Sequence, residues 1–164
     1  GILTDTGSFG FDSTTPHTHR VVSALLKFDL PVGELYRLVY ETMPKNDLRA
    51  FLSLMNTLSL HHDDKVACLT ITKKQAAKLS ADFDLKDKVF GFLRAVKGIE
   101  VIMILTEQDG HKTRLNFRSR GKVDVAHFAS QFNGGGHRNA SGGFLDMPLQ
   151  RAAGRVLKEI RKAL

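Results

Sequence analysis

The sequence is poor in cysteine and contains no long apolar run. One cysteine among 164 residues, Cys68, excludes an internal disulfide and is compatible with a reducing compartment. We interpret Cys68, within "KVACLTIT", as a small buried hydrophobic residue rather than a nucleophile. No segment approaches the roughly 18 apolar residues of a membrane span, so we expect no membrane partner.

The N-terminal residues, "GILTDTGSFGF", lack a basic segment followed by a long apolar stretch. They therefore do not resemble a signal peptide, and we expect a cytoplasmic protein. They also begin without Met, which is expected of a processed chain or of a piece of a longer protein. A hydrophobic content of 42% with 25% charged residues is globular rather than disordered.

Basic residues are not in excess over the first two thirds of the chain. Residues 1–110 carry 13 Lys and Arg against 14 Asp and Glu, whereas residues 111–164 carry 11 against 3. Such a localised basic field favours a phosphate-bearing partner. The alternative is a solvated helix face, which we prefer for five residues near the C-terminus: Arg151, Arg155, Lys158, Arg161 and Lys162. A solvated helix face explains four other basic residues less well: Arg114, Arg118, Arg120 and Arg138.

Helical patterns dominate the first 60 residues. A helix is expected over 14–28, with Thr15 as N-cap and Pro16 at its first position. A second begins at Pro31 and is broken by Pro44. Its apolar side is predicted to hold Leu35, Leu38 and Val39. A third covers 45–60, and its inward residues are predicted to be Leu48, Phe51, Leu52 and Met55. No strand lies between these helices, so 31–60 is predicted to be a helical connector.

The pattern changes after residue 60 and predicts one α/β domain over 61–164. Strands are expected at 65–72 and 98–107, the second of them central, with a return strand at 112–120 and an edge strand at 142–147. The turn "QDGH", with Asp109-Gly110 at its tip, would join the second strand to the third as a hairpin. Helices are expected at 72–79, 85–96, 123–132 and 148–164.

Glycine is concentrated in "QFNGGGHRNASGG", residues 131–143. Glycines at 134–136 let the backbone approach a ligand closely and turn its N–H groups toward an anion. We expect the following residues to enter a helix whose N-terminus adds positive potential. His137 could then donate to a phosphate oxygen or a sugar hydroxyl. A flexible loop with a surface histidine is the alternative.

The predicted return strand places its polar residues on one face. Alternation puts Arg114, Asn116, Arg118 and Arg120 together, and Leu115, Phe117 and Ser119 on the opposite face. Arginines at alternating positions beside a glycine loop suit bidentate binding of a phosphate. A plain solvent-exposed face would explain the same pattern.

Two further polar segments could hold metal ligands. Asp5 follows apolar residues in "LTDTGSFGF", where we expect the end of a buried strand. α/β proteins place functional carboxylates just beyond the carboxyl ends of strands, although Asp5 could equally cap a turn. The run "HHDD" at 61–64 is predicted to be a polar turn.

Taken in order, "TDTGSF", "TTPHTHRVVSALL", "RSRG" and "GGGHRNASG" resemble the DHH phosphoesterases that carry a DHHA1 domain. The most similar group is the oligoribonuclease and 3′-phosphoadenosine-5′-phosphate phosphatase type, often called nanoRNases. The resemblance covers the whole chain. It implies an α/β fold in which 61–164 form a DHHA1-type mixed sheet with flanking helices. Residues 31–60 would be the helical linker, and 1–30 the C-terminal remnant of a DHH domain.

The resemblance implies a parent enzyme that uses manganese or another divalent ion to cleave short oligoribonucleotides, 3′,5′-bisphosphate nucleotides or both. Asp5 matches the last metal ligand of the family. The chain has no Asp-His-His triplet and no paired-aspartate motif before Asp5. We therefore expect the chain alone to bind no metal and to be inactive.

The same resemblance implies where the substrate binds. Arg118, Ser119 and His137 should contact its phosphate or sugar, and Gly134, Gly135 and Gly136 should shape the loop. Arg120, Arg138 and Asn139 are further candidates. Short RNA or nucleotide phosphates are the expected partners, and a homodimer is possible. Two other functions stay open: a non-catalytic nucleic-acid-binding module, and a phosphodiesterase acting on cyclic dinucleotides or polyphosphate.

Overall fold

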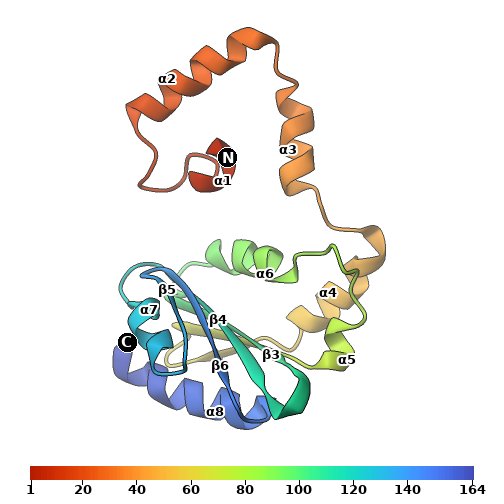
Figure 1. Ribbon diagram of the computed structural model, residues 1–164, viewed down its shortest axis with the longest axis vertical. Helices are drawn as coiled ribbons and strands as arrows, with labels where there is room; N and C mark the ends of the chain where they lie inside the picture. The colour runs from red at the N-terminus through yellow and green to blue at the C-terminus, as the bar shows by residue number, and fades with distance from the viewer. The chain divides into compact units, whose positions relative to one another are not determined.

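The computed structural model describes residues 1–164, with the side-chain environment of every residue except Gly110 (Figure 1). The chain divides into two compact units, Gly1–Thr42 and Met43–Leu164. Among the described residues, no helix combines the length and the apolar character that crossing a bilayer requires.

The first unit is helical. Its elements are α1 (Ile2–Asp5), α2 (Pro16–Leu25), the 3₁₀ turn η1 (Leu26–Phe28) and α3 (Val32–Tyr40). Thr15 caps α2 through a capping box with Thr18, and Pro16 occupies the first turn, as predicted. The apolar side chains of α3 expected on one side, Leu35, Leu38 and Val39, are exposed.

The prediction of a buried strand ending before Asp5 is wrong. Residues Ile2–Asp5 form the helix α1, and none of them is buried. The backbone N–H of Asp5 donates to the carbonyl of Gly1, and the N–H of Thr6 donates to that of Ile2, both at 3.0 Å. The described residues of this unit offer the segment no strand to pair with. Its backbone groups are instead satisfied locally, by helical hydrogen bonds.

The second unit is built on a six-stranded mixed sheet in the order β1-β2-β3-β4-β6-β5. Its strands are β1 (Ser59–His61), β2 (Val66–Ile71), β3 (Val101–Glu107), β4 (Thr113–Ser119), β5 (Gly135–His137) and β6 (Ala140–Leu145). β2 and β3 are parallel, and the other neighbours are antiparallel. The predicted hairpin of β3 and β4 and the central place of β3 are confirmed, with η3 (Asp109–His111) at the turn.

The strand predicted at the sheet edge is not an edge strand. β6 pairs with β4 on one side and with β5 on the other. The unexpected outer strand, β5, consists of two glycines and His137. Glycine is a poor strand former, so its composition gave no strand signal, and the pairing with β6 determines its conformation.

Helices cover both faces of the sheet. Figure 1 shows α8 (Leu149–Ile160) along one face and α6 (Leu85–Arg94) along the other. α7 (Val125–Ser130) lies on the α8 face, where Phe128 packs edge-on against Phe117 and Phe132, with ring centroids 5.2 and 5.1 Å apart. α4 (Leu48–Met55) and α6 both contribute to the hydrophobic core on the opposite face of the sheet. The remaining short elements are η2 (Lys45–Asp47), α5 (Lys73–Ala76) and η4 (Arg161–Ala163).

The third predicted helix differs from α4 in its extent and in its buried side. α4 ends at Met55, and 59–61 form β1 instead of continuing the helix. Phe51 and Leu54 are buried, whereas Leu48 and Leu52 are exposed. Leucines occur on both sides of this helix, so its composition could not define which side faces β2.

Cys68 is buried in the core between β2 and α8, as predicted. Burial raises the pKa of its thiol to about 11, because the uncharged form is favoured away from water. A thiol held in this state at neutral pH is a packing residue rather than a nucleophile.

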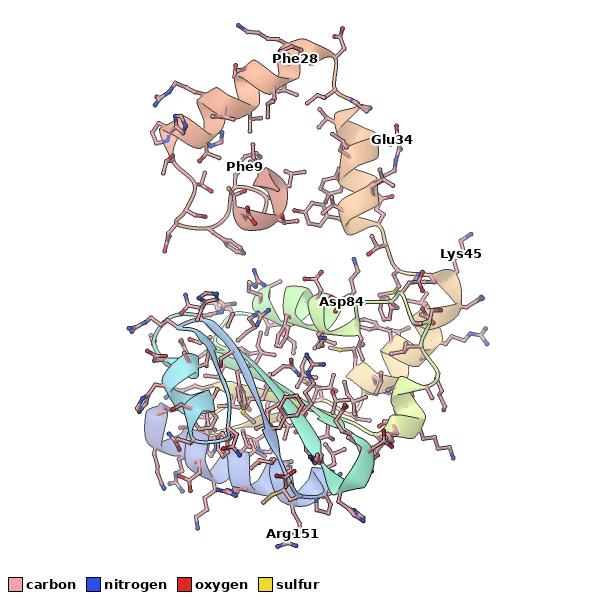
Figure 2. The ribbon with its side chains drawn as sticks, in the orientation of Figure 1. Phe9, Phe28, Glu34, Lys45, Asp84 and Arg151 are labelled. Atoms are coloured by element: carbon pink, nitrogen blue, oxygen red, sulfur yellow. The ribbon has the colours of Figure 1, made fainter. Side chains whose placement is uncertain are left out.

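The basic residues of the terminal helix project into solvent, as preferred from the sequence. Arg151, Arg155 and Lys158 of α8 are exposed, as are Arg161 and Lys162. Figure 2 shows Arg151 pointing away from the sheet. These charges add a general positive field at the surface.

Candidate functional site

Within the second unit, the described helices leave one part of the sheet uncovered. The core on the α6 side draws its strand residues from β2 and β3, and none of its described members comes from β4, β5 or β6. On β4, Leu115 and Phe117 are buried in the opposite core, while Asn116 and Arg118 face the α6 side, as the predicted alternation requires. The uncovered surface therefore lies beyond α6.

This surface, here called the open face, is formed by residues paired directly across three strands. Between β4 and β6, Arg118 pairs with Ala140, Asn116 with Gly142 and Arg114 with Phe144. On the outer pair, Gly135 lies opposite Gly142 and His137 opposite Ala140. Residues directly opposite one another share a face of the sheet. The open face thus contains Arg114, Asn116, Arg118, Gly135, His137, Ala140, Gly142 and Phe144.

Arg118 is the best-positioned cation of the open face. Its guanidinium carbon lies 4.7 Å from the centroid of the Phe90 ring on α6. Partial burial lowers the pKa of Arg118, and nearby Arg94 adds to the effect, while Asp87 and Asp84 oppose it. An arginine remains charged at neutral pH despite such a shift. Stacking holds the planar group while leaving N–H groups at its edge for an anion.

Two neighbours of Arg118 that were also expected to contact substrate are engaged elsewhere. Arg120 donates from Nη2 to the carbonyls of Arg94 and, at 2.8 Å, of Val96, at the C-terminal end of α6. Such bonds satisfy carbonyls left over at a helix end. Ser119 lies on the opposite side of β4, where its hydroxyl donates to the Val123 carbonyl at 2.6 Å. In this conformation both side chains stabilise the frame around Arg118.

The prediction of a helix after the three glycines is wrong. The chain turns back at Arg138-Asn139 and continues as strand β6. A Cβ on Gly134 would lie 2.1 Å from the carbonyl oxygen of Gly142. At Gly136, φ is +142° and a Cβ would lie 2.5 Å from the Ala140 carbonyl oxygen. These two glycines are required for the close approach of the hairpin strands.

Gly135 differs from its two neighbours. A Cβ there would meet nothing within 4 Å. Packing inside the protein therefore does not require glycine at this position, and the space above its backbone is open. An absent side chain beside open space is what a ligand needs in order to approach the main chain.

Hydrogen bonds tie the turn of "RSRG" to the tip of the glycine hairpin. The N–H of Val125 donates to the Arg138 carbonyl at 2.9 Å, and the N–H of Ser119 donates to the Asn139 carbonyl at 3.1 Å. The Ser141 hydroxyl donates to the Val125 carbonyl at 2.5 Å. Arg138 and Asn139 contribute through their backbone carbonyls, and Nη2 of Arg138 also donates to the Gly121 carbonyl at 3.3 Å. His137 is exposed beside them. The sequence gave no sign of the part that Ser141 plays.

Asp124→Ala is expected to lower the unfolding temperature, because Asp124 caps α7. Its carboxylate accepts from the N–H groups of Ala126 and His127, both at 3.0 Å. The bond from His127 is the largest cause that holds the Asp124 pKa below its usual value. A depressed pKa stabilises the fold fully above the unfolded-state pKa, and this contribution is lost as pH falls through the folded-state pKa.

Asp124→Asn is the matched control, because asparagine is also a good N-cap but does not titrate. We expect it to remain close to wild type in stability at neutral pH and to lose part of the acid dependence. Thermal unfolding from about pH 7 down to about pH 2 measures both effects. Identical acid dependence in wild type and Asp124→Asn would contradict this account.

The first unit places Asp5, the predicted metal ligand, at the end of α1, where it is exposed. Among the described residues, no group of three or more His, Cys, Asp or Glu could hold a metal ion. The part of the chain that the structure describes thus brings together no ligand set of the size that a two-metal centre needs. The polar turn predicted at 61–64 is confirmed for its last three residues: His62, Asp63 and Asp64 have left-handed φ angles of 55°, 55° and 60°. His61 is instead the last residue of β1.

The profile of the DHHA1 domain matches residues 63–164, the part of the chain that carries the open face. The chain belongs to the DHHA1 domain family. Its match extends from the polar turn to the last residue and includes both the "RSRG" turn and the glycine hairpin.

Curated relatives extend the similarity to the first unit. The bifunctional oligoribonuclease and PAP phosphatase NrnA of Thermus thermophilus is 34% identical over 166 residues, which is all of this chain and 49% of that protein. The protein of the same name from Bacillus subtilis is 32% identical over 143 residues, or 87% of this chain and 44% of that protein. The chain thus spans about half the length of these relatives.

A solved structure shares the fold over nearly the whole chain. An exopolyphosphatase-related protein from Bacteroides fragilis superposes with a TM-score of 0.86 at 26% sequence identity. The match covers 99% of this chain and 48% of that one. These similarities confirm the family that the motifs indicated.

Sequence reasoning missed some residues of the site. Asn116 was placed on the correct face by alternation but was not chosen as a site residue. Phe90 gave no signal, because its contact with Arg118 joins two elements that are distant in sequence. The capping role of Asp124 could have been found, because an aspartate directly before an apolar helical run is a typical N-cap.

Proposed function

We propose that this chain is the nucleotide-binding part of a metal-dependent phosphoesterase that cleaves short oligoribonucleotides, 3′,5′-bisphosphate nucleotides or both. One observation carries the proposal. Arg118, stacked on Phe90, shares an uncovered face with exposed His137 and with the bare backbone of Gly135. The names of the NrnA relatives agree with this substrate class.

The chemistry of the open face suits a phosphate group. The fork of N–H donors on Arg118 can bind two phosphate oxygens at once. β5 is the outermost strand of the described sheet, so backbone groups on its outer side face no ladder partner. With glycine at 135, an oxygen can come close to this backbone, and His137 can donate to a second oxygen or to a sugar hydroxyl. These residues bind and orient the substrate.

We propose the domain arrangement that the resemblance implies: a DHH remnant at 1–30, a linker at 31–60 and a DHHA1 domain at 61–164. Divalent ions, manganese in our proposal, would polarise the phosphoryl group when bound in the parent enzyme. Asp5 is the one residue here that matches their ligands. We propose that the chain alone binds no such ion and hydrolyses no phosphoester.

A second candidate substrate is polyphosphate. The Bacteroides fragilis structure is described as exopolyphosphatase-related and covers nearly all of this chain. Polyphosphate offers the same oxygens to Arg118 but carries no base and no sugar. A comparison of the two ligand classes therefore separates the proposals.

The test is a titration of the 164-residue chain, followed by NMR, with adenosine 3′,5′-bisphosphate and with a linear polyphosphate of matched charge. We expect the nucleotide to bind with a Kd on the order of 10 μM to 1 mM, more tightly than polyphosphate. Binding should weaken as salt rises, because phosphate contacts release counterions. Undetectable nucleotide binding would overturn the proposal, and manganese-dependent release of phosphate by the pure chain would overturn the predicted inactivity.

A further inference from the structure

A cavity lies next to the open face, between the beginning of α6, the residues of α5 and the last residues of β3. Its volume is about 180 Å³. Ten residues line it: Ile71, Ala76, Phe83, Asp84, Leu85, Lys86, Thr106, Gln108, Arg114 and Asn116. Figure 2 shows Asp84 where the chain enters α6. Arg114 and Asn116 belong to both the cavity and the open face, so the two are continuous.

The size and lining of the cavity suit an aromatic ring. Four of its residues are apolar: Ile71, Ala76, Phe83 and Leu85. A complete ligand of drug size needs roughly 300 Å³ or more, whereas an apolar cavity of about 150 Å³ accepts a single benzene ring. At about 180 Å³, this cavity has room for one part of a ligand, of the size of one ring system.

The polar residues of the cavity suit the edge of such a ring. Asn116, Gln108 and Thr106 offer amide and hydroxyl groups, which pair with the donors and acceptors of a base. The Nδ2 atom of Asn116 is buried and has no hydrogen-bond partner among the described residues. A buried donor of this kind is satisfied when a ligand brings an acceptor. Asp84 lines the same cavity together with two cations, Lys86 and Arg114.

The distance from the phosphate site is also suitable. Arg118 and Asn116 are two residues apart on β4 and point to the same face. Two residues of a strand span about 6.6 Å. A ribose ring bridges a comparable gap between its phosphate and its base. A nucleotide whose phosphate is bound by Arg118 can therefore reach the cavity with its base.

We infer that this cavity is a nucleobase subsite, in which the base of the nucleotide lies on the apolar lining and pairs with Asn116. The inference rests on the proposed function, because it takes Arg118 as the phosphate anchor. It adds that the base, as well as the phosphate, contributes to binding. Ligands without a base should therefore bind more weakly than nucleotides with the same phosphate.

The experiment compares adenosine 5′-monophosphate with ribose 5-phosphate, which lacks the base, by NMR titration of the 164-residue chain. Wild type should bind the nucleotide about tenfold more tightly than ribose 5-phosphate. Ala76 is half-buried and lines the cavity, whereas Ala77 is exposed and is not part of the lining. Ala76→Phe should fill the cavity and reduce nucleotide affinity to the level of ribose 5-phosphate, leaving ribose 5-phosphate binding unchanged. Ala77→Phe, the matched control, should change neither.

A second measurement does not depend on whether Ala76→Phe folds. In wild type, adenosine alone should shift the amide signals of Ala76, Leu85 and Thr106, and ribose 5-phosphate should shift those of Arg118 and Gly135. Equal affinity of wild type for the two phosphate ligands, or equal weakening of both by Ala76→Phe, would overturn the subsite while leaving the phosphate site intact. Absence of binding by either phosphate ligand would overturn the proposed function together with the subsite.

Discussion

Arg118→Ala is expected to weaken binding of adenosine 3′,5′-bisphosphate more than any other single arginine replacement in this chain. The variant loses a charge-assisted contact to phosphate worth about 1.5–3 kcal/mol, which is roughly 10- to 100-fold in Kd. Because the guanidinium stacks on Phe90 at 4.7 Å, it is held in place before the ligand arrives. The entropic cost of ordering this side chain on binding is therefore small. Calorimetric or NMR titration gives the two constants.

Arg161→Ala is the matched control, since Arg161 is an exposed arginine of η4 and has the same charge. It should leave the affinity nearly unchanged. Arg118→Lys should fall between Arg118→Ala and wild type, because lysine keeps the charge but lacks the planar fork. If Arg161→Ala weakens binding as much as Arg118→Ala does, the ligand responds to a diffuse field and not to a built site.

The second large effect is expected at the glycine hairpin. Gly134→Ala should destabilise the fold by about 1–3 kcal/mol, because the new methyl group overlaps a backbone carbonyl that has little room to move. The Cβ would lie 2.1 Å from the oxygen of Gly142 and 2.9 Å from that of Ala129. Chemical denaturation measures this loss, and ligand binding should fall with it.

Gly135→Ala is the variant to compare with Gly134→Ala. Its methyl group meets nothing within 4 Å, so the stability should stay close to that of wild type. The same methyl group stands on the open face, where it should keep the phosphate from the backbone and weaken binding about tenfold. Unchanged affinity in Gly135→Ala would show that the ligand does not approach this backbone. Unchanged stability in Gly134→Ala would contradict the hairpin geometry.

Much of the sheet could be predicted because its signals are local. β2 and β3 are apolar runs of strand length, and Asp109-Gly110 marks the hairpin between β3 and β4. On β4 the period of two places Asn116 with Arg118, so the β4 part of the open face follows from alternation alone. The order of the motifs identified the DHHA1 family, and the match over 63–164 confirms it.

What could not be predicted depends on contacts between distant segments. Three glycines followed by His137 are compatible with a helix N-terminus and with a tight hairpin, and the pairing with β6 selects the hairpin. Arg118 and Arg120 are equivalent in the sequence pattern. They differ in the structure, because Arg118 stacks on Phe90 of α6 while Arg120 bonds the carbonyls at the end of that helix. Alternation gives the face of a side chain but not its partner.

The ties between the "RSRG" turn and the hairpin tip limit where this domain can gain or lose residues. α7 has six residues, and hydrogen bonds join Val125 to Arg138 and Gly134 to Ala129 at its two ends. A single inserted residue between 121 and 139 would shift one motif against the other. The turn at η3 lies at the opposite end of β4 from Arg118. Length variation, or an attached reporter group, should therefore be tolerated at η3 while the spacing around α7 stays fixed.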